Sequence, residues 1–404
     1  MKIFYRPLYL NRIVSRLNKG MMLVLIGQRR VGKSFMLRIL KRWIEENHTS
    51  ASVAYINKEL REFGTIKNSD DLYAFVDQNL PPNNENYLLI DEVQDIEGYE
   101  EALRSLYAEN RCQIVITGSN AFIFSTELST KLAGRYIEIP IYSLNYNEFL
   151  LFHHLEDSED SLRKYLKVGG LPGLANFDIS DEAEVRDYLQ GVYNTILMRD
   201  IVLRENIRNI AFLENLSHFI ADNIGKLISS NGISKYMKSQ REKISDGLVS
   251  DYLRYLCGAL LASEVNRYDI HGKKLFEFIH KYYFSDIGIR NLLVGFNLIG
   301  SIEKVIENVV YNHLRAWGWN VTVGILRVGE IDFVATKDSD KIYIQATYLL
   351  GSEETIAREF GNLNSIKDHY PKMVVSMDPV GGELPKFPGI KHYPLRDFLK
   401  MTLR

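Results

Sequence analysis

The stretch Gly27-Gln28-Arg29-Arg30-Val31-Gly32-Lys33-Ser34 decides the fold of this chain. It fits the pattern G-x-x-x-x-G-K-[ST], which is the phosphate-binding P-loop. An apolar run at 21–26 precedes it, as expected of a buried strand, and residues 35–44 carry apolar side chains at helical spacing. Because strand, glycine loop and helix is the context that the motif requires, the sequence predicts a nucleotide site here rather than a plain glycine-rich turn.

The chemistry of this loop follows largely from its backbone. Glycines at 27 and 32 let the loop wrap a phosphate with its N–H groups pointing inward, and the start of the following helix adds a partial positive charge. Lys33 would reach the β- and γ-phosphates of ATP, and the Ser34 hydroxyl would ligate Mg²⁺. The predicted nucleotide-binding residues are Gly27, Gln28, Arg29, Arg30, Val31, Gly32, Lys33, Ser34 and Phe35.

A second apolar run, Tyr87-Leu88-Leu89-Ile90-Asp91-Glu92, ends in two carboxylates and fits the Walker B pattern. A buried strand of this kind would deliver Asp91 to the magnesium shell and Glu92 to the attacking water. The alternative is a core strand that ends at a solvated acidic turn. The P-loop upstream favours the catalytic interpretation, in which Glu92 polarises water for in-line attack on the γ-phosphate.

Three polar residues further along are candidates for completing the site. The apolar segment 113–118 predicts a strand that ends at Ser119 and Asn120, and either side chain could hold the γ-phosphate or the water; the alternative for both is a helix-capping turn. Arg135 precedes the predicted strand 136–139 and is a candidate arginine finger, acting in its own subunit or in a neighbour, with a surface salt bridge as the alternative. Alternating strands and helices at this spacing predict a parallel sheet covered on both faces.

Bulk properties limit what the rest of the chain can be. With 404 residues, 46% hydrophobic and 25% charged, we expect a globular protein of two or three domains. The net charge of −2 provides no global basic field, so any binding of nucleic acid must come from a local patch. The two cysteines suggest no disulfide framework, and no apolar run approaches the roughly 20 residues of a membrane span. We therefore expect a cytoplasmic location and no membrane partner.

The region from about 205 to 290 predicts a winged helix-turn-helix, because three helices are followed by two strands, 262–265 and 276–284. A recognition helix beginning near Ser245, together with a basic wing, would suit contacts with duplex DNA. The alternative is a winged helix used for protein contacts or as a spacer. The candidate nucleic-acid-binding residues are Lys243, Arg254, Lys273 and Lys274.

The last hundred residues predict another α/β unit, with a helix carrying Glu307, a strand carrying Asp332 and a strand over 341–347. This is the layout of PD-(D/E)XK nucleases, in which carboxylates hold Mg²⁺ and a lysine orients water. The third element should read Glu-x-Lys but reads Gln345-Ala346-Thr347. Since a carboxylate and a lysine are both missing, we predict a nuclease-like fold used for binding or assembly rather than an active nuclease.

Together these residues resemble the AAA+-type P-loop ATPases of bacteria and archaea, and more closely the branch with a C-terminal domain of unknown function. The matching stretches are Gly27 to Ser34, Leu89-Ile90-Asp91-Glu92, Thr117-Gly118-Ser119, Leu132-Ala133-Gly134-Arg135 and Gly169-Gly170-Leu171-Pro172. The C-terminal part also resembles the domain that follows the ATPase in this family, so the resemblance covers nearly the whole chain. The resemblance implies a five-stranded core, ATP at the ends of its strands, Ser119 or Asn120 as sensor, and a small helical lid over the nucleotide.

The expected fold is α/β, with a P-loop parallel sheet and helical lid followed by a winged-helix domain and a small nuclease-like domain. The expected boundaries are 1–145 for the ATPase core, 146–204 for the lid, 205–290 for the winged helix and 291–404 for the nuclease-like domain. The leading hypothesis is a Mg²⁺-dependent ATPase that couples nucleotide state to a DNA- or protein-binding region, with self-assembly left open. The alternatives are a nucleotide-gated DNA-binding switch with little turnover and, with less support, a metal-dependent nuclease.

Overall fold

The computed structural model describes residues 4–82, 84–118, 131–132, 134–240, 243–270, 279–297, 300–327 and 329–403. The chain divides into two compact units. The first comprises Met1–Tyr142 with Gly258–Leu260, and the second comprises Ser143–Cys257 with Leu261–Arg404. Each unit has its own sheet, and the predicted α/β fold class with a parallel P-loop sheet is confirmed.

The first unit alternates strands and helices. In chain order its elements are α1 Pro7–Val14, β1 Met22–Ile26, α2 Lys33–Asn47, β2 Ser52–Asn57, the 3₁₀ turn η1 Arg61–Phe63, α3 Ser69–Asn79, β3 Asn86–Asp91, the 3₁₀ turn η2 Val93–Asp95, α4 Tyr99–Ala108, β4 Gln113–Gly118 and β5 Tyr136–Pro140. Local signals set several boundaries: α3, for example, begins after a capping box in which Asn68 and Asp71 each accept the other's backbone N–H.

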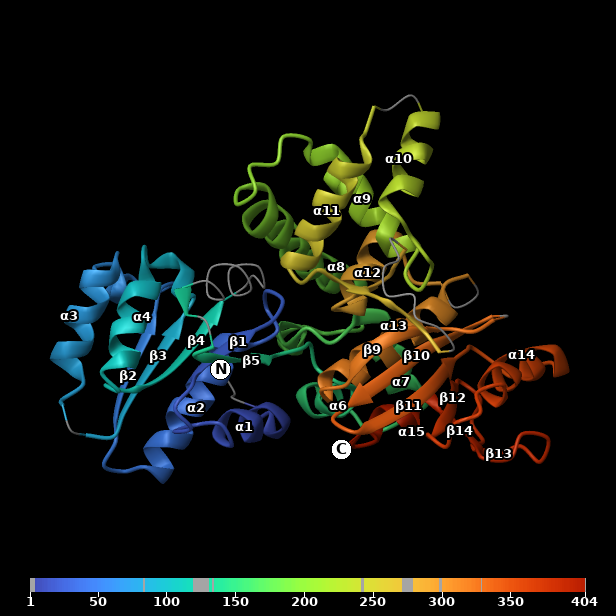
Figure 1. Ribbon diagram of the computed structural model, residues 1–404, viewed down its shortest axis with the longest axis horizontal. Coiled ribbons are helices and arrows are strands. Elements are labelled where there is room, and N and C mark those ends of the chain that lie inside the picture. Colours follow the sequence, from blue (N-terminus) through green and yellow to red (C-terminus); the bar gives the residue numbers. More distant parts are fainter. Residues whose placement is uncertain are drawn as a thin grey trace. The chain divides into compact units, whose positions relative to one another are not determined.

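The sheet of this unit has five strands in the order β2-β3-β4-β1-β5, and every neighbouring pair is parallel. Its central strands are apolar and buried because helices cover both faces: α3 and α4 pack on one face and α2 with α1 on the other (Figure 1). Parallel strands place all their carboxyl ends at one edge. The carboxyl ends of β1, β3 and β4 therefore lie at that edge, where α/β sheets bind ligands.

The second unit begins with a largely helical part. Its elements are α6 Tyr146–His153, α7 Glu159–Val168, the 3₁₀ segment η4 Pro172–Asn176, α8 Glu182–Thr195, the π-helix η5 Ile196–Val202, α9 Ile210–Asp222, α10 Ser230–Ser239, α11 Asp246–Gly258 and, further along, α12 Ile287–Val294. The segment 146–204, which we expected to be a lid, falls in this unit. Its helices α7 and α8 pack against α12, and its function over the nucleotide stays a prediction.

The Gly169-Gly170 pair has a packing role in this unit. Gly169 has φ +78°, and a Cβ there would lie 2.3 Å from Oδ1 of Asp286. The backbone N–H of Gly170 donates to Oδ2 of the same buried carboxylate at 2.9 Å. Asp286 also caps α12, because its Oδ1 accepts the N–H of Gly288 at 2.9 Å. The glycine pair therefore lets the end of α7 lie directly against the start of α12.

The remainder of the second unit is built around a seven-stranded mixed sheet in the order β13-β14-β12-β11-β10-β9-β7 (Figure 1). The strands are β7 Arg267–Asp269, β9 Asn320–Ile325, β10 Glu330–Lys337, β11 Asp340–Ala346, β12 Lys372–Ser376, β13 Gly382–Glu383 and β14 Ile390–Pro394, and the helices are α13 Ile302–Ala316, α14 Glu353–Asn364 and α15 Leu395–Lys400. β9, β10 and β11 form an antiparallel meander, and α14 connects β11 to the parallel strand β12.

The expected winged-helix hairpin differs from the structure in one respect. Strand β6, Ala262–Val265, pairs antiparallel with β8, Lys281–Phe284, as the sequence suggested. Residues 267–269, however, form β7, which pairs in parallel with β9 of the large sheet. Arg267 therefore belongs to a strand of the large sheet and not to the hairpin of β6 and β8. The predicted wing residues Lys273 and Lys274 lie outside the described residues.

Candidate functional site

The P-loop connects β1 to α2, as the motif requires. Helix α2 begins at Lys33, and its N-cap, Gly32, has φ +97°, a conformation that favours glycine. Gly27 is needed for a different reason, because a Cβ at this position would lie 2.3 Å from the carbonyl oxygen of Ile141. The two motif glycines thus serve a left-handed backbone turn and a close approach between loop and sheet.

Lys33 lies buried over the loop. Its Nζ donates hydrogen bonds to the carbonyl oxygens of Gly27 at 2.8 Å and Gln28 at 3.1 Å. The side chain of Gln28 is also buried, and its amide oxygen and nitrogen have no hydrogen-bond partner among the described residues. A buried ammonium and an unsatisfied amide at the start of a helix provide donors for an anionic ligand. Arg29, Arg30, Val31, Ser34 and Phe35 complete the predicted set around this turn.

Asp91 ends β3 next to the phosphate loop, as predicted. Its Oδ1 accepts a hydrogen bond from the Thr117 hydroxyl at 2.6 Å, while the buried Oδ2 has no hydrogen-bond partner in the part of the chain that is described. Burial raises the pKa of Asp91, and the Thr117 and Ser34 hydroxyls and the Lys33 ammonium oppose that rise. A buried carboxylate oxygen without a partner, beside a serine hydroxyl, fits a magnesium ligand set.

Glu92 has an unusual backbone conformation for a glutamate, with φ +55° and ψ +56°. Its N–H donates to the Thr117 hydroxyl at 3.0 Å, so Thr117 contacts both Walker B residues. Its carboxylate accepts a hydrogen bond from the Gln94 side chain. Thr117 occurs in the motif Thr117-Gly118-Ser119, but nothing in that motif indicates this double contact.

Arg6, which the sequence analysis did not identify, holds the phosphate loop through backbone carbonyl oxygens. Arg6, at the start of α1, is buried and donates to the carbonyl oxygen of Val31 at 3.0 Å and to that of Tyr142 at 2.9 Å. Its guanidinium also lies over the ring of Tyr9, 4.4 Å from the centroid. No motif marks this contact, because its partners are backbone carbonyls 25 and 136 residues away.

The structure describes only one of the other predicted catalytic residues, Arg135. Ser119 and Asn120 lie outside the described residues. Arg135 immediately precedes β5, whose first residue pairs with Met22 at the amino end of β1, while the P-loop follows the carboxyl end of β1. Four residue steps separate these ends, or about 13 Å. Arg135 therefore lies at the edge of the sheet opposite its own phosphate loop, with its guanidinium 6.0 Å from the ring centroid of Tyr107.

The structure describes two of the four candidate nucleic-acid-binding residues. Lys243 is exposed just before α11, and Arg254 is exposed on that helix, where it forms an ion pair with Asp251 at 3.0 Å. The exposed surface of α11 also carries Asp246. Helix α10 is different, because the chain has no Asp or Glu from 223 to 240 and α10 exposes Lys235, Tyr236 and Lys238.

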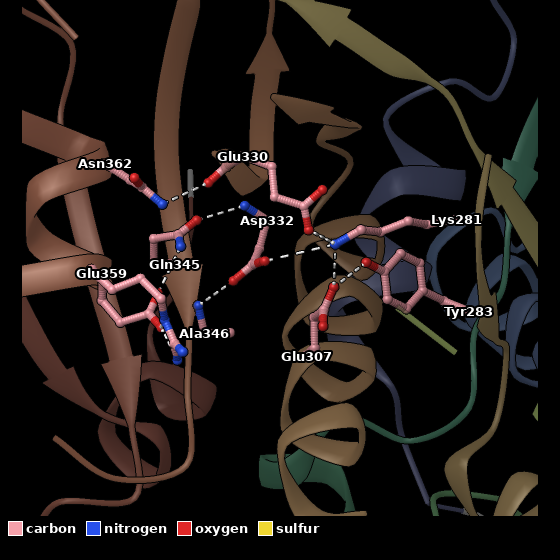
Figure 2. A network of polar contacts seen from close by, with 10 residues as sticks. Lys281, Tyr283, Glu307, Glu330, Asp332, Gln345, Ala346, Glu359 and Asn362 are labelled. Atoms are coloured by element: carbon pink, nitrogen blue, oxygen red, sulfur yellow. Dashed lines mark hydrogen bonds and ion pairs between the residues drawn. The ribbon is translucent and has the colours of Figure 1, made fainter. Parts of the chain in front are cut away.

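The second polar cluster lies in the C-terminal unit, where Glu307 of α13 and Asp332 of β10 come together as predicted (Figure 2). Between them lies Lys281 of β8, which the sequence analysis did not identify. Its Nζ is 3.1 Å from Glu307, 2.8 Å from Glu330 and 3.7 Å from Asp332. Burial lowers the pKa of Lys281, but the three carboxylates outweigh it and raise that pKa above its ordinary value. Burial and the neighbouring Glu307 raise the pKa of Asp332 well above its usual range.

Gln345 stands where the nuclease pattern requires a carboxylate. Its Oε1 accepts the backbone N–H of Asp332 at 2.7 Å, and its Nε2 donates to Glu359 of α14 at 2.7 Å (Figure 2). Both ends of the amide are therefore used within the protein. Among the described residues, no group of three or more His, Cys, Asp or Glu side chains is arranged to hold a metal ion. In the same residues, no helix combines the length and apolar character needed to cross a membrane.

The parallel sheet, the P-loop and the acidic end of β3 define a P-loop NTPase unit of the AAA type. Residues 19–150 match the family described as an AAA domain, and residues 159–298 match a domain of unknown function (DUF8612). The chain belongs to the same family as an uncharacterized protein of Haemophilus influenzae, with which it is 33% identical over 92% of both chains. An uncharacterized protein of Methanocaldococcus jannaschii is 28% identical over 81% of this chain and 74% of that protein.

A solved structure was also found to be similar. The Walker-type ATPase of Pyrococcus abyssi aligns with 72% of this chain and 96% of its own, at 16% sequence identity and a TM-score of 0.49.

Proposed function

We propose that this protein binds ATP with Mg²⁺ and hydrolyses it. The observation that carries this proposal is the arrangement of Asp91 and Glu92, which are both held by Thr117 at the strand edge where the P-loop lies. P-loop proteins that only bind nucleotide do not need a second carboxylate, whereas hydrolysis needs a group that orients or polarises water. The family assignment supports the nucleotide-binding part of the proposal.

Each residue has a distinct task in this proposal. The Lys33 ammonium exchanges the carbonyls of Gly27 and Gln28 for phosphate oxygens, which are stronger acceptors. Ser34 and Asp91 hold the Mg²⁺, which when bound neutralises charge on the phosphates. Glu92 leaves the Gln94 amide and accepts a hydrogen bond from the attacking water. Ser119 or Asn120 senses the γ-phosphate, as the resemblance implies.

The test is ATP turnover and nucleotide affinity in two variants, each with a matched control. Lys33→Ala should lose nucleotide binding, and Glu92→Gln should keep binding but lower kcat by a factor of roughly 100 or more. The controls are Lys41→Ala, a partly exposed lysine of α2, and Glu101→Gln, an exposed glutamate of α4, and both should behave like the wild type. Full turnover in Lys33→Ala would refute the proposal.

Assembly is tested in the same experiment. Arg135 cannot reach its own phosphate loop from the opposite sheet edge, so a finger role requires a neighbouring subunit. In that case specific activity rises with protein concentration. A mixture of Lys33→Ala and Arg135→Ala subunits should also regain activity. Half of the interfaces between the two kinds of subunit combine the intact loop of one with the intact arginine of the other. Turnover that is independent of concentration, with no gain on mixing, would remove Arg135 from the site.

A second candidate function is a nucleotide-gated DNA-binding switch, and the surface of α10 favours it. Lys235, Lys238 and exposed Tyr236 form a basic, aromatic surface without an acidic neighbour in its own stretch, while Arg254 on α11 is already paired with Asp251. Phosphate contacts by lysine and stacking on tyrosine are both typical of nucleic-acid binding.

Duplex binding at two salt concentrations, with and without ATP, tests this switch. Lys235→Ala with Lys238→Ala should weaken binding and reduce its salt dependence, whereas Arg254→Ala should change little. Lys273→Ala with Lys274→Ala tests the predicted wing in the same way. The absence of salt-dependent binding by the wild type would refute the switch without affecting the ATPase proposal.

A further inference from the structure

The layout of α13, β9, β10 and β11 raises the question of what cation balances the carboxylates of Glu307, Glu330 and Asp332. We propose that the ammonium of Lys281 is the resident cation of this cluster, in the place where a nuclease of the expected layout would hold its divalent metal. The unit then keeps its carboxylates together without a metal ion and does not cleave DNA. This inference does not depend on the proposed ATPase activity.

The first argument is the position of the ammonium. Nζ of Lys281 lies 3.1, 2.8 and 3.7 Å from oxygens of Glu307, Glu330 and Asp332, so it sits at the centre of the group (Figure 2). The Lys281 side chain is only 2% exposed. Its neighbours Tyr282, Tyr283 and Phe284 on β8 are buried as well, so the strand anchors the ammonium in the cluster. A divalent cation would have to displace it or lie a few ångströms from a like charge.

The second argument is that protein donors already bind one oxygen of Glu307 and one oxygen of Asp332. Oε1 of Glu307 also accepts the hydroxyl of Tyr283 at 2.5 Å, and Oδ2 of Asp332 accepts the N–H of Ala346 at 2.9 Å. Hydrogen bonds from protein to the two carboxylates compete with a metal for the same lone pairs. With Lys281 in place, the residues present therefore do not fit a divalent metal centre.

The third argument comes from the positions that should complete a metal site. Gln345 contributes no charge, and its amide is committed to Asp332 and Glu359. Thr347, where the pattern requires lysine, has its hydroxyl 3.5 Å from Glu303. The lysine is thus supplied from β8, 66 residues before Thr347 in the chain, which is why the motif appeared to lack it. The negative charge lost at Gln345 and the central position of Lys281 both favour an internal cation over a metal.

The experiment measures thermal unfolding of the full chain with and without millimolar Mn²⁺, in wild type and in Lys281→Met. We expect Mn²⁺ to leave the wild-type Tm unchanged. Lys281→Met should unfold roughly 10 °C lower, because three carboxylates lose their cation, and Mn²⁺ should restore a large part of that loss. Lys304→Met is the matched control, since among the described residues this partly buried lysine forms an ion pair only with Asp222, and its variant should not respond to Mn²⁺.

A second comparison keeps the inference testable if Lys281→Met does not fold. Direct Mn²⁺ titration of wild type and of Glu307→Gln with Asp332→Asn should give the same binding curve, because neither residue holds a metal in the native chain. Plasmid DNA incubated with Mg²⁺ or Mn²⁺ should stay intact. Mn²⁺ binding that disappears in this double variant, or cleavage abolished by Asp332→Ala, would overturn the inference.

Discussion

Thr117 offers the sharpest test of the nucleotide site, because one hydroxyl contacts both Walker B residues. Replacing it by valine keeps the shape of the side chain and removes the hydroxyl. Asp91 then loses a 2.6 Å hydrogen bond to a charged acceptor, worth about 1.5–3 kcal/mol. The N–H of Glu92 loses its 3.0 Å acceptor, and an unsatisfied buried donor costs about 1–3 kcal/mol. We expect the free energy of unfolding to fall by about 2–4 kcal/mol, since some of the loss relaxes.

The catalytic effect of this change should be larger than its effect on binding. Glu92 is held in a left-handed conformation, and without its backbone hydrogen bond its side chain loses the fixed starting point that the proposed role in orienting water requires. We expect kcat to fall by a factor of roughly 10 to 100, with little change in ATP affinity, because Lys33 and the loop amides remain. Turnover and nucleotide binding measured on the same preparation separate the two effects.

The pH dependence of the variant gives a second measurement. Burial raises the pKa of Asp91, and the Thr117 hydroxyl is one of the groups that oppose this rise. Without it the folded-state pKa of Asp91 rises further, so the acid limb of kcat/KM moves to higher pH. Because a raised carboxyl pKa favours the protonated folded state, the Asp91 contribution to stability is largest below the unfolded pKa and is lost as pH rises through the folded pKa.

Thr117→Ser is the control, because it restores the hydroxyl and removes only a methyl group. Serine should recover the turnover and the position of the acid limb, although the missing methyl lowers stability slightly. If valine and serine variants have equal kcat, or if the valine variant retains wild-type turnover, Thr117 does not position the Walker B residues and the reasoning fails.

Three other predictions concern single positions. Asp91→Asn removes a buried charge, so it should raise the Tm by a few degrees while abolishing Mg²⁺-dependent turnover, and a lower Tm would contradict the unpaired state of its Oδ2. Gly169→Ala places a Cβ 2.3 Å from Asp286 at φ +78°, so it should lower the Tm by roughly 10 °C, whereas Gly191→Ala, inside α8 with open space around it, should raise the Tm slightly. In Arg6→Lys the smaller number of donors cannot serve the carbonyls of both Val31 and Tyr142, so the variant should bind fluorescent ATP several-fold more weakly. Unchanged affinity would show that Arg6 has only a packing role.

The P-loop and the end of β3 were predictable because the residues that form each of them are adjacent in the sequence. Backbone N–H groups bind the phosphate, so Gly27 to Ser34 must be adjacent in sequence, and Asp91 follows directly from the strand that delivers it. Strand spacing also predicted the parallel sheet. Thr117 and Arg6 could not be assigned in the same way, because their partners are set by strand order and by backbone carbonyls far along the chain.

The C-terminal cluster shows the same limit more clearly. Glu307 and Asp332 were predicted from element order, and the structure brings them together (Figure 2). The nuclease motif requires a lysine two positions after Gln345, because it defines the site by the spacing of residues along one strand. The protein satisfies the electrostatic requirement instead, with an ammonium from β8 that reaches the same carboxylates through the fold. The charge balance of a cluster depends on which side chains lie close together in the folded protein. A cation that is missing from its expected position in the sequence can therefore be supplied by another strand.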